Sequence, residues 1–200
     1  MTLDLAASRL PRDFYRRPTI AVARDLPGKV LVATGDGRHP PRVARIVEVE
    51  AYLGERDLAS HARRGPTPRA AIMFGPAGFL YVYLVYGMHH CMNVVTEDDG
   101  IAGAVLLRAA EPISGIDDRD DARRLAGPGK LCSGLGITRQ DNGLDLCADG
   151  GHVFLTDGGE RPPRLKRSVR IGVAYAGAWA DRPLRFYVPG NPHVSARPRD

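Results

Sequence analysis

Two apolar runs joined by a tight turn are the feature that most restricts this fold. The first run is Leu80-Tyr-Val-Tyr-Leu-Val85, and its aromatic and β-branched residues favour a strand. Gly87 marks the turn, and Cys91-Met-Asn-Val-Val95 is a second strand-like run. Two such runs separated by a glycine-containing turn predict a β-hairpin, and therefore an antiparallel sheet.

Three tyrosines on this hairpin allow two interpretations. Successive strand side chains point to opposite faces, so Tyr81 and Tyr83 share one side, whereas Tyr86 falls at the turn and projects past the sheet. Aromatic residues often occur in strands simply because they pack well. A projecting ring in a basic protein can also enter a nucleic-acid base stack while chemistry is performed on an extruded nucleotide. The hairpin alone leaves both interpretations open.

The composition predicts one ordinary globular domain. A chain of 200 residues with 44% hydrophobic and 26% charged residues can bury a sizeable core. Its net charge of +5 is compatible with a polyanionic partner but does not require one.

Cysteine usage and the absence of targeting signals indicate the compartment. Cys91, Cys132 and Cys147 form no CxxC pair, which argues against a disulfide framework and a zinc ribbon and favours a reducing environment. The N-terminus lacks a basic segment followed by an apolar run, and no stretch of about 18 uncharged apolar residues occurs. We therefore expect a soluble cytoplasmic protein without a membrane partner.

The remaining patterns predict an α+β fold in a single domain spanning residues 1–200. Short helices are expected where a proline opens an apolar repeat and where acidic residues precede basic ones. We expect the tail after Pro192 to be loosely ordered. The predicted helices are 10–15, 18–26, 116–125 and one opening at Gly127, and the further strands are 29–33, 44–53, 103–109, 153–155, 168–174 and 184–188.

Glu50 is the sharpest candidate for catalysis. Residues 44–53 alternate so that Ile46, Glu48, Glu50 and Tyr52 are expected on one face of a strand. A carboxylate near a glycosidic carbon can deprotonate a water and stabilise the oxocarbenium-like transition state. The alternative is that Glu48 and Glu50 only form the solvated face of the strand.

A basic segment follows this strand. His61 is a candidate for hydrogen bonding to a phosphate or a base, and Arg63, Arg64 and Arg69 suit phosphate contacts. Each of them has the alternative of being an ordinary surface residue. The helix expected after Gly127 carries Lys130 and offers N-terminal amides to an anion such as a backbone phosphate.

Several other chemistries lack their sequence motifs. His89 and His90 are adjacent on a strand and point to opposite faces, and no HxxxH, HExxH or cysteine partner supports a metal site. The chain also contains no GxSxG elbow, no phosphate-binding GK[ST] loop and no GxGxxG turn. We therefore expect neither a metal nor a cofactor.

Seven blocks together resemble the alkyladenine (3-methyladenine) DNA glycosylase family. The resemblance spans roughly residues 8 to 195, and its most specific parts are the Glu-Ala-Tyr and Tyr-Val-Tyr segments. The blocks are Val47-Glu-Val-Glu-Ala-Tyr-Leu-Gly54, Ser60-His-Ala-Arg63, Thr67-Pro-Arg69, residues 80–93, Val105-Leu-Leu-Arg-Ala109, Gly127-Pro-Gly-Lys-Leu131 and Pro183-Leu-Arg-Phe-Tyr-Val188. The resemblance implies a compact α+β domain with a curved antiparallel sheet, flanking helices and a protruding hairpin that enters the DNA minor groove.

Site roles also follow from the resemblance. It implies that Glu50 is the general base and that Arg108 lies near the catalytic water. It further implies that Tyr52, His61 and Tyr83 enclose the flipped base and that Asn93 excludes guanine by clashing with its amino group. The implied intercalating residues at the hairpin tip are Tyr86 and Met88, and the implied backbone contacts are Arg63, Arg69 and Lys130.

The reaction implied is hydrolysis of the N-glycosidic bond of alkylated or deaminated purines in duplex DNA. Substrates of the 3-methyladenine, 7-methylguanine, hypoxanthine and ethenoadenine type are expected, with a free base and an abasic site as products and no strand cleavage. We expect a monomer with damaged double-stranded DNA as its partner. A catalytically silent DNA-binding module and a nucleoside hydrolase are the alternatives.

Overall fold

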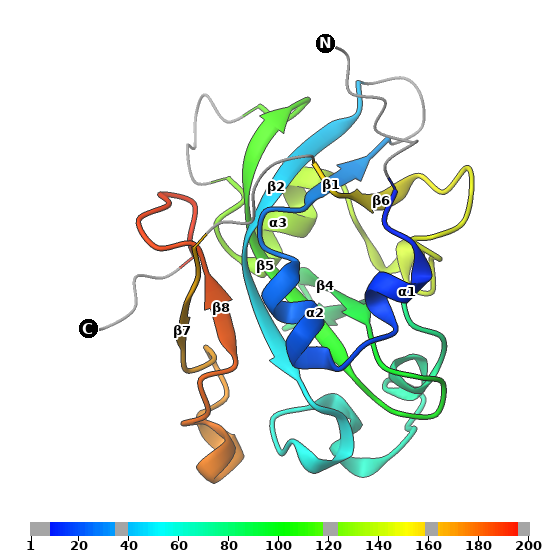
Figure 1. The fold of residues 1–200 in the computed structure, drawn as a ribbon, viewed down its shortest axis with the longest axis vertical. Helices are drawn as coiled ribbons and strands as arrows, with labels where there is room; N and C mark the ends of the chain where they lie inside the picture. The colour runs from blue at the N-terminus through cyan, green and yellow to red at the C-terminus, as the bar shows by residue number, and fades with distance from the viewer. Residues whose placement is uncertain (1–8, 35–39, 118–123, 159–163, 196–200) are drawn as a thin grey trace.

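One curved antiparallel sheet with short flanking helices forms the protein (Figure 1). The computed structural model describes residues 9–34, 40–117, 124–158 and 164–195. The predicted α+β class, the single compact domain and the curved antiparallel sheet are all confirmed.

The sheet has the order β3-β4-β5-β2-β1-β6, and β8 pairs with both β2 and β7 outside this path. The long central pair, β2 and β5, runs through the middle of the molecule (Figure 1). Every pair is antiparallel, as hairpin-type connections allow. The strands are β1 Val30–Ala33, β2 Arg42–Tyr52, β3 Leu80–Val85, β4 His89–Val95, β5 Ala104–Ser114, β6 Val153–Thr156, β7 Lys166–Ser168 and β8 Arg185–Tyr187.

Short helices cover this sheet. Helix α2 follows Pro18 and buries Val22 and Ala23 against β2 and β5. Helix α3 has Pro128 in its first turn, and its C-cap residue Gly136 adopts the left-handed conformation. The helix predicted to open at Gly127 is therefore confirmed. The α-helices are α1 Arg12–Tyr15, α2 Thr19–Asp25 and α3 Pro128–Leu135, and the 3-10 helices are η1 Gly54–Arg56, η2 His61–Arg64, η3 Ala71–Phe74, η4 Arg139–Asp141 and η5 Ala174–Trp179.

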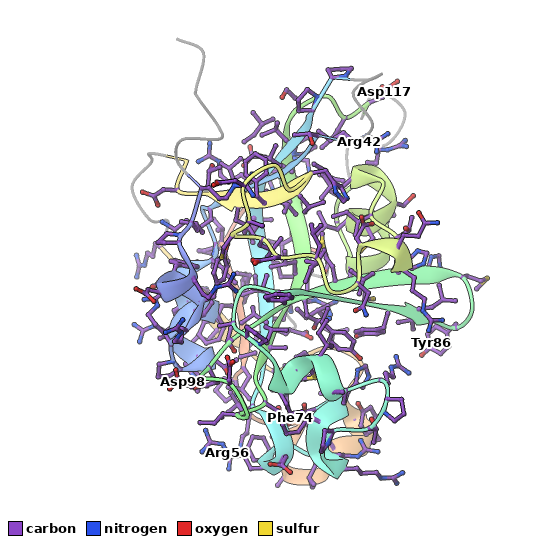
Figure 2. All side chains as sticks on the ribbon, turned by 90° about the vertical axis from the view of Figure 1, so that its right-hand side faces the viewer. Arg42, Arg56, Phe74, Tyr86, Asp98 and Asp117 are labelled. Atoms are coloured by element: carbon purple, nitrogen blue, oxygen red, sulfur yellow. The ribbon has the colours of Figure 1, made fainter. Side chains whose placement is uncertain are left out.

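The β3–β4 hairpin projects from the body and carries Tyr86 at its tip (Figure 2). The turn needs positive φ at two successive positions, 52° at Tyr86 and 70° at Gly87, and the Met88 N–H donates to the Val85 carbonyl at 3.1 Å. Tyr86 is 87% exposed and Met88 72%, whereas Tyr81 is buried. The predicted division between a projecting Tyr86 and packed tyrosines is therefore confirmed.

Two irregularities in the pairing of β2 with β5, one between Ile46 and Glu48 and one between Glu48 and Val49, change which β2 side chains share a face. Ile46 pairs with Ala110 and Glu48 with Ala109, so Val47 is an extra residue on β2. Because this bulge reverses the alternation, Ile46 packs in the main core instead of lying on the face of Glu48. The predicted strict alternation was wrong at this point.

The alternative that Glu48 and Glu50 only form a solvated face of this strand is also wrong. Glu48 and Glu50 both have 0% exposure, although a charged residue is rarely buried without a partner. Their partners lie across the sheet on β5 and β8 and are described below.

Two strand predictions differ from the structure. Strand β5 continues to Ser114, past Pro112, instead of closing near Ala109. The predicted strand 168–174 does not form, because β7 ends at Ser168 and the Arg170 guanidinium that follows is buried in an ion pair with Asp57.

The C-terminal tail was also predicted incorrectly as far as Ser195. Val194 is buried, and Ser195 donates its N–H to Glu48 at 2.6 Å. This segment is fixed because it supplies hydrogen bonds to a buried carboxylate. Most of the predicted helix 116–125 lies outside the described residues.

Candidate active site

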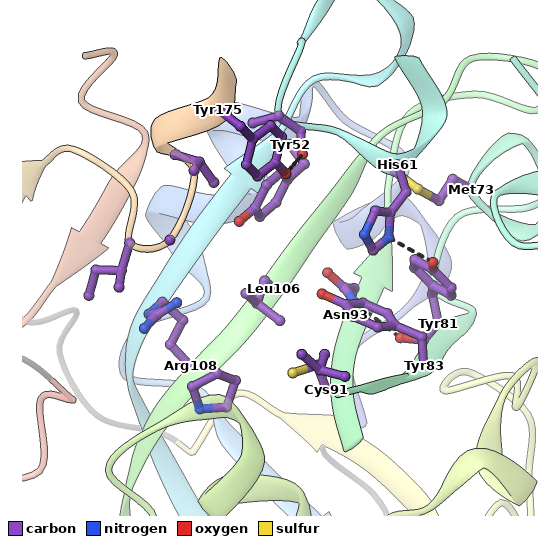
Figure 3. A pocket seen from close by; sticks show the side chains of 16 residues that line it. Tyr52, His61, Met73, Tyr81, Tyr83, Cys91, Asn93, Leu106, Arg108 and Tyr175 are labelled. Carbon is purple, nitrogen blue, oxygen red and sulfur yellow. Dashed lines mark hydrogen bonds between the residues drawn. The ribbon is translucent and has the colours of Figure 1, made fainter. Parts of the chain in front are cut away.

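A pocket of about 190 Å³ opens beside the base of the β3–β4 hairpin (Figure 3). Strands β2, β3, β4 and β5, the helix η2 and the segment 171–175 contribute to its wall. The structure therefore brings together residues that are more than 100 positions apart. The predicted site residues that line the pocket are Tyr52, His61, Tyr83, Asn93 and Arg108.

Glu50 lies directly behind this wall. Its Oε1 accepts the Ile171 N–H at 2.8 Å and lies 3.2 Å from Arg108 Nη1, and its Oε2 accepts the Tyr52 hydroxyl at 2.8 Å. All three of these neighbours line the pocket. The carboxylate is therefore fixed at both oxygens, and each of its partners lines the cavity.

Arg108 connects the two buried glutamates of β2. Its Nε donates to Glu48 Oε1 at 2.9 Å, and Arg185 Nε donates to the same oxygen at 2.7 Å. Burial alone would lower the pKa of Arg108, but Glu50 and Glu48 raise it above its ordinary value. Arg108 therefore stays charged, and Ser195 completes the hydrogen bonding of Glu48.

Two tyrosine rings form aromatic walls of the pocket. Burial, followed by the charge of Glu50, raises the pKa of Tyr52, and burial likewise raises the pKa of Tyr83. Both phenols are therefore neutral at physiological pH. A guanidinium lies over each ring, since that of Arg170 is 4.7 Å from the Tyr52 ring centre and that of Arg69 is 4.7 Å from the Tyr83 ring centre.

His61 is a neutral member of the pocket. Burial, then the charges of Arg69 and Arg63, lowers its pKa to about 4. Its Nδ1 lies 2.9 Å from the Tyr81 hydroxyl (Figure 3), and its ring meets the Tyr83 ring edge-on at 4.7 Å. Which group donates in this bond depends on the histidine tautomer, and when the Tyr81 hydroxyl donates, the imidazole proton lies on Nε2.

Asn93 is held at the pocket wall by its amide group. Its Nδ2 donates to the Tyr81 carbonyl at 3.1 Å (Figure 3), and the residue is only 4% exposed. Since the nitrogen is used, the orientation of the side chain is fixed. A fixed polar group can exclude a ligand that is too large at that point.

The predicted DNA-contacting residues lie outside the pocket lining. Tyr86 and Met88 are at the hairpin tip, and the exposed Arg63, Arg69 and Lys130 lie on η2, on the loop after it and on α3. The Arg63 guanidinium is oriented by the Leu58 carbonyl at 3.0 Å. The structure thus separates a pocket from a basic and aromatic surface.

Sequence reasoning missed several residues of the site. Ile171 and Tyr175 line the pocket, and Asp57 and Arg170 form a buried ion pair next to it. These contacts link segments more than 100 positions apart, so no local pattern indicated them. One available signal was Gly172, which adopts a φ of 78° and interrupts the run that was interpreted as a strand.

Within residues 9–34, 40–117, 124–158 and 164–195, no group of three or more His, Cys, Asp and Glu side chains is arranged to hold a metal ion. In the same ranges, no helix has both the length and the apolar character needed to cross a bilayer.

Comparison with known proteins assigns the family. A family model described as methylpurine-DNA glycosylase (MPG) matches residues 13–192. Proteins named "Putative 3-methyladenine DNA glycosylase" are 51% identical over 190 residues in Myxococcus xanthus and 48% identical over 187 residues in Legionella pneumophila strain Lens. These alignments cover 94% of this chain, and 94% and 98% of those proteins, respectively. The chain therefore belongs to the methylpurine-DNA glycosylase family, and it is a DNA glycosylase that acts on alkylated bases.

Proposed function

We propose that this protein flips alkylated or deaminated purines out of duplex DNA and hydrolyses their N-glycosidic bond with a water activated by Glu50. One observation carries the proposal. Glu50 is fully buried, yet each of its three hydrogen-bonding or ionic neighbours, Tyr52, Arg108 and Ile171, lines the pocket. A water that reaches the carboxylate between these three residues would face the sugar of a nucleotide held in the pocket.

Glu50 suits this chemistry in two ways. A carboxylate can accept a proton from the water as the bond to the sugar forms, and its negative charge stabilises the oxocarbenium-like sugar. The fixed hydrogen bonds from Tyr52 and Ile171 hold the group in place, so little reorganisation is needed during the reaction. Arg108 neutralises the site before the substrate enters.

The pocket walls suit a purine that carries a positive charge. Alkylation at N3 or N7 makes the base cationic, and a cation is attracted to the faces of neutral tyrosine rings. Tyr52 and Tyr83 provide such rings, and a neutral His61 adds no repulsion. For a neutral base such as hypoxanthine, the proton on His61 Nε2 offers a hydrogen bond that helps the leaving base.

The proposed products are a free base and an abasic site, without strand cleavage. Cleavage by elimination requires an amine nucleophile that attacks the sugar. The described residues that line the pocket include no lysine. Hydrolysis is therefore the favoured route.

We propose that duplex DNA is bound through the hairpin tip and the basic residues around it, with the protein acting as a monomer. Tyr86 and Met88 would fill the space left by the extruded nucleotide, since apolar side chains can wedge between base steps. Arg63, Arg69 and Lys130 would contact phosphates, in keeping with the net charge of +5. Damaged bases pair and stack less well, so their extrusion costs less.

The test is direct excision. The protein is incubated with a duplex containing one 3-methyladenine analogue, hypoxanthine or ethenoadenine, and abasic sites are then cut with hot alkali. We expect cleavage only after alkali treatment. Binding of damaged DNA without any alkali-labile product would favour a silent binding module, and release of bases from free nucleosides would favour a nucleoside hydrolase.

A further inference from the structure

Asp57 and Arg170 form a completely buried, two-point ion pair. Asp57 Oδ2 lies 2.5 Å from Arg170 Nη1, Asp57 Oδ1 lies 2.9 Å from Arg170 Nη2, and both side chains have 0% exposure. Paired parallel hydrogen bonds of this type are strong and fix the relative orientation of the two groups. The pair joins the loop after η1 to the segment after β7.

Arg170 holds the strand on which Glu50 lies. Its Nη1 donates to the Ala51 carbonyl at 2.9 Å, and its guanidinium covers the Tyr52 ring at 4.7 Å. Ala51 and Tyr52 directly follow Glu50 in the chain. The guanidinium therefore restrains the backbone beside Glu50 and the ring whose hydroxyl donates to Glu50.

The same arginine also places the opposite side of the carboxylate. Ile171, its neighbour in the chain, donates its N–H to Glu50 Oε1 at 2.8 Å. Asp57 anchors the arrangement by accepting the N–H groups of Leu53 and Ala59, each at 3.0 Å. The contacts therefore form a closed path. It runs from Glu50 along the chain to Ala51 and Tyr52, across to Arg170, and through the Ile171 N–H back to Glu50.

The pair itself makes no contact with the cavity. Neither Asp57 nor Arg170 is among the described residues that line the pocket. A buried ion pair also adds little net stability, because apolar side chains of similar size would serve as well. Arg170 Nε is buried and has no hydrogen-bond partner within the part of the chain that the structure describes. An unpaired buried donor lowers the stability of the fold, so a stabilising role alone does not account for this arginine.

We propose that Asp57 and Arg170 are positioning residues that hold Glu50 and Tyr52 in the orientation needed to activate the attacking water, a role that rests on the proposed function of Glu50. They act mainly on the chemical step, because neither side chain lines the pocket that would hold the flipped base. Displacement of a catalytic group by about 1 Å can lower a rate about 100-fold, so loosening this pair should be visible in the rate.

The experiment compares Asp57→Asn and Arg170→Lys with the wild-type chain. Asp57→Asn replaces one acceptor oxygen with a donor, and Arg170→Lys keeps the charge but loses the two-point contact. We expect the single-turnover excision rate at saturating hypoxanthine duplex to fall about 10- to 100-fold per folded molecule. The dissociation constant for a duplex whose 2′-fluoro sugar resists hydrolysis should stay within about threefold, because neither substituted side chain lines the pocket.

Asp145→Asn is the control for loss of an Arg–Asp pair away from the pocket. Asp145 also combines an arginine partner, Arg12 at 2.6 Å, with a backbone N–H, that of Cys147 at 2.9 Å, but it does not line the pocket. This variant should lower the melting temperature and leave the rate per folded molecule unchanged. Wild-type rates in both Asp57→Asn and Arg170→Lys, or an equal slowing in Asp145→Asn, would overturn the inference. An inactive wild-type chain would refute the proposed function instead.

Discussion

Arg108 and Glu50 form a buried ion pair in which Arg108 Nη1 lies 3.2 Å from Glu50 Oε1. The same guanidinium binds Glu48 through Nε at 2.9 Å. Two carboxylates on one strand, both without exposure to water, would repel each other if no cation lay between them. Arg108 therefore allows the sheet to bury both glutamates, one of which is the proposed general base.

Removal of this cation should be costly for the fold. Arg108→Gln leaves the Glu50 carboxylate without its charged partner, and breaking a buried pair on one side typically destabilises a protein by about 3–5 kcal/mol. Urea unfolding of the wild type and the variant checks the prediction. Arg24→Gln, an exposed change on α2, serves as the control and should alter the free energy of unfolding by less than about 0.5 kcal/mol. A loss below about 1 kcal/mol in Arg108→Gln would contradict this account.

Tyr86→Ser should separate binding from stability. The ring is 87% exposed, so its removal should leave the melting temperature unchanged. Binding of hypoxanthine duplex should weaken at least about 10-fold, because the wedge that replaces the extruded nucleotide is lost. Fluorescence anisotropy measures the affinity. Leu58→Ser removes an apolar side chain that is 50% exposed and lies outside the hairpin, and this variant should bind DNA normally. A large fall in melting temperature with normal binding would identify Tyr86 as a packing residue.

Asn93→Ser should relax the choice of base. Asn93 is fixed by its bond to the Tyr81 carbonyl, and a smaller side chain opens space for an exocyclic amino group. The rate for guanine relative to hypoxanthine, each placed in the same duplex, should rise about 10-fold, which is a usual effect of a small change in pocket size. An unchanged ratio would show that another residue excludes guanine.

His61 should make stability depend on pH. Its pKa of about 4 in the folded protein lies below its ordinary value of 6.5, so at pH 5 the unfolded chain binds a proton that the folded protein does not. The stability contributed by the neutral ring is complete above pH 6.5 and is lost as the pH falls toward 4. Between pH 7.5 and 5.0 this loss is about 2 kcal/mol.

Urea unfolding at both pH values measures this effect. His61→Gln cannot titrate, so its stability should fall less than that of the wild type over the same interval. The difference between the two proteins should be about 2 kcal/mol. Equal losses in the two proteins would mean that His61 keeps its ordinary pKa.

Local patterns in the sequence predicted the parts of the molecule that depend on neighbouring residues. The hairpin, its projecting Tyr86 and helix α3 follow from turn glycines, alternation and a proline in the first helical turn. The resemblance added the pocket residues, and the structure does bring Tyr52 and His61 to one cavity.

Features set by distant contacts could not be predicted in this way. The bulge at Val47 depends on the register with β5, and the alternation of β2 alone gives no sign of it. Ser195 is ordered because it binds Glu48, 147 positions away. Arg170 leaves the predicted strand and pairs with Asp57, which is 113 positions away. Each of these is a tertiary contact that overrides a local preference.

Glu50→Gln tests the central claim most directly. The amide is nearly isosteric and can still accept from Ile171, but it cannot take a proton from water. Single-turnover excision of hypoxanthine at saturating enzyme should fall at least about 100-fold, while binding of the lesion duplex is retained. A rate within about threefold of the wild type would contradict the assignment of Glu50 as the general base.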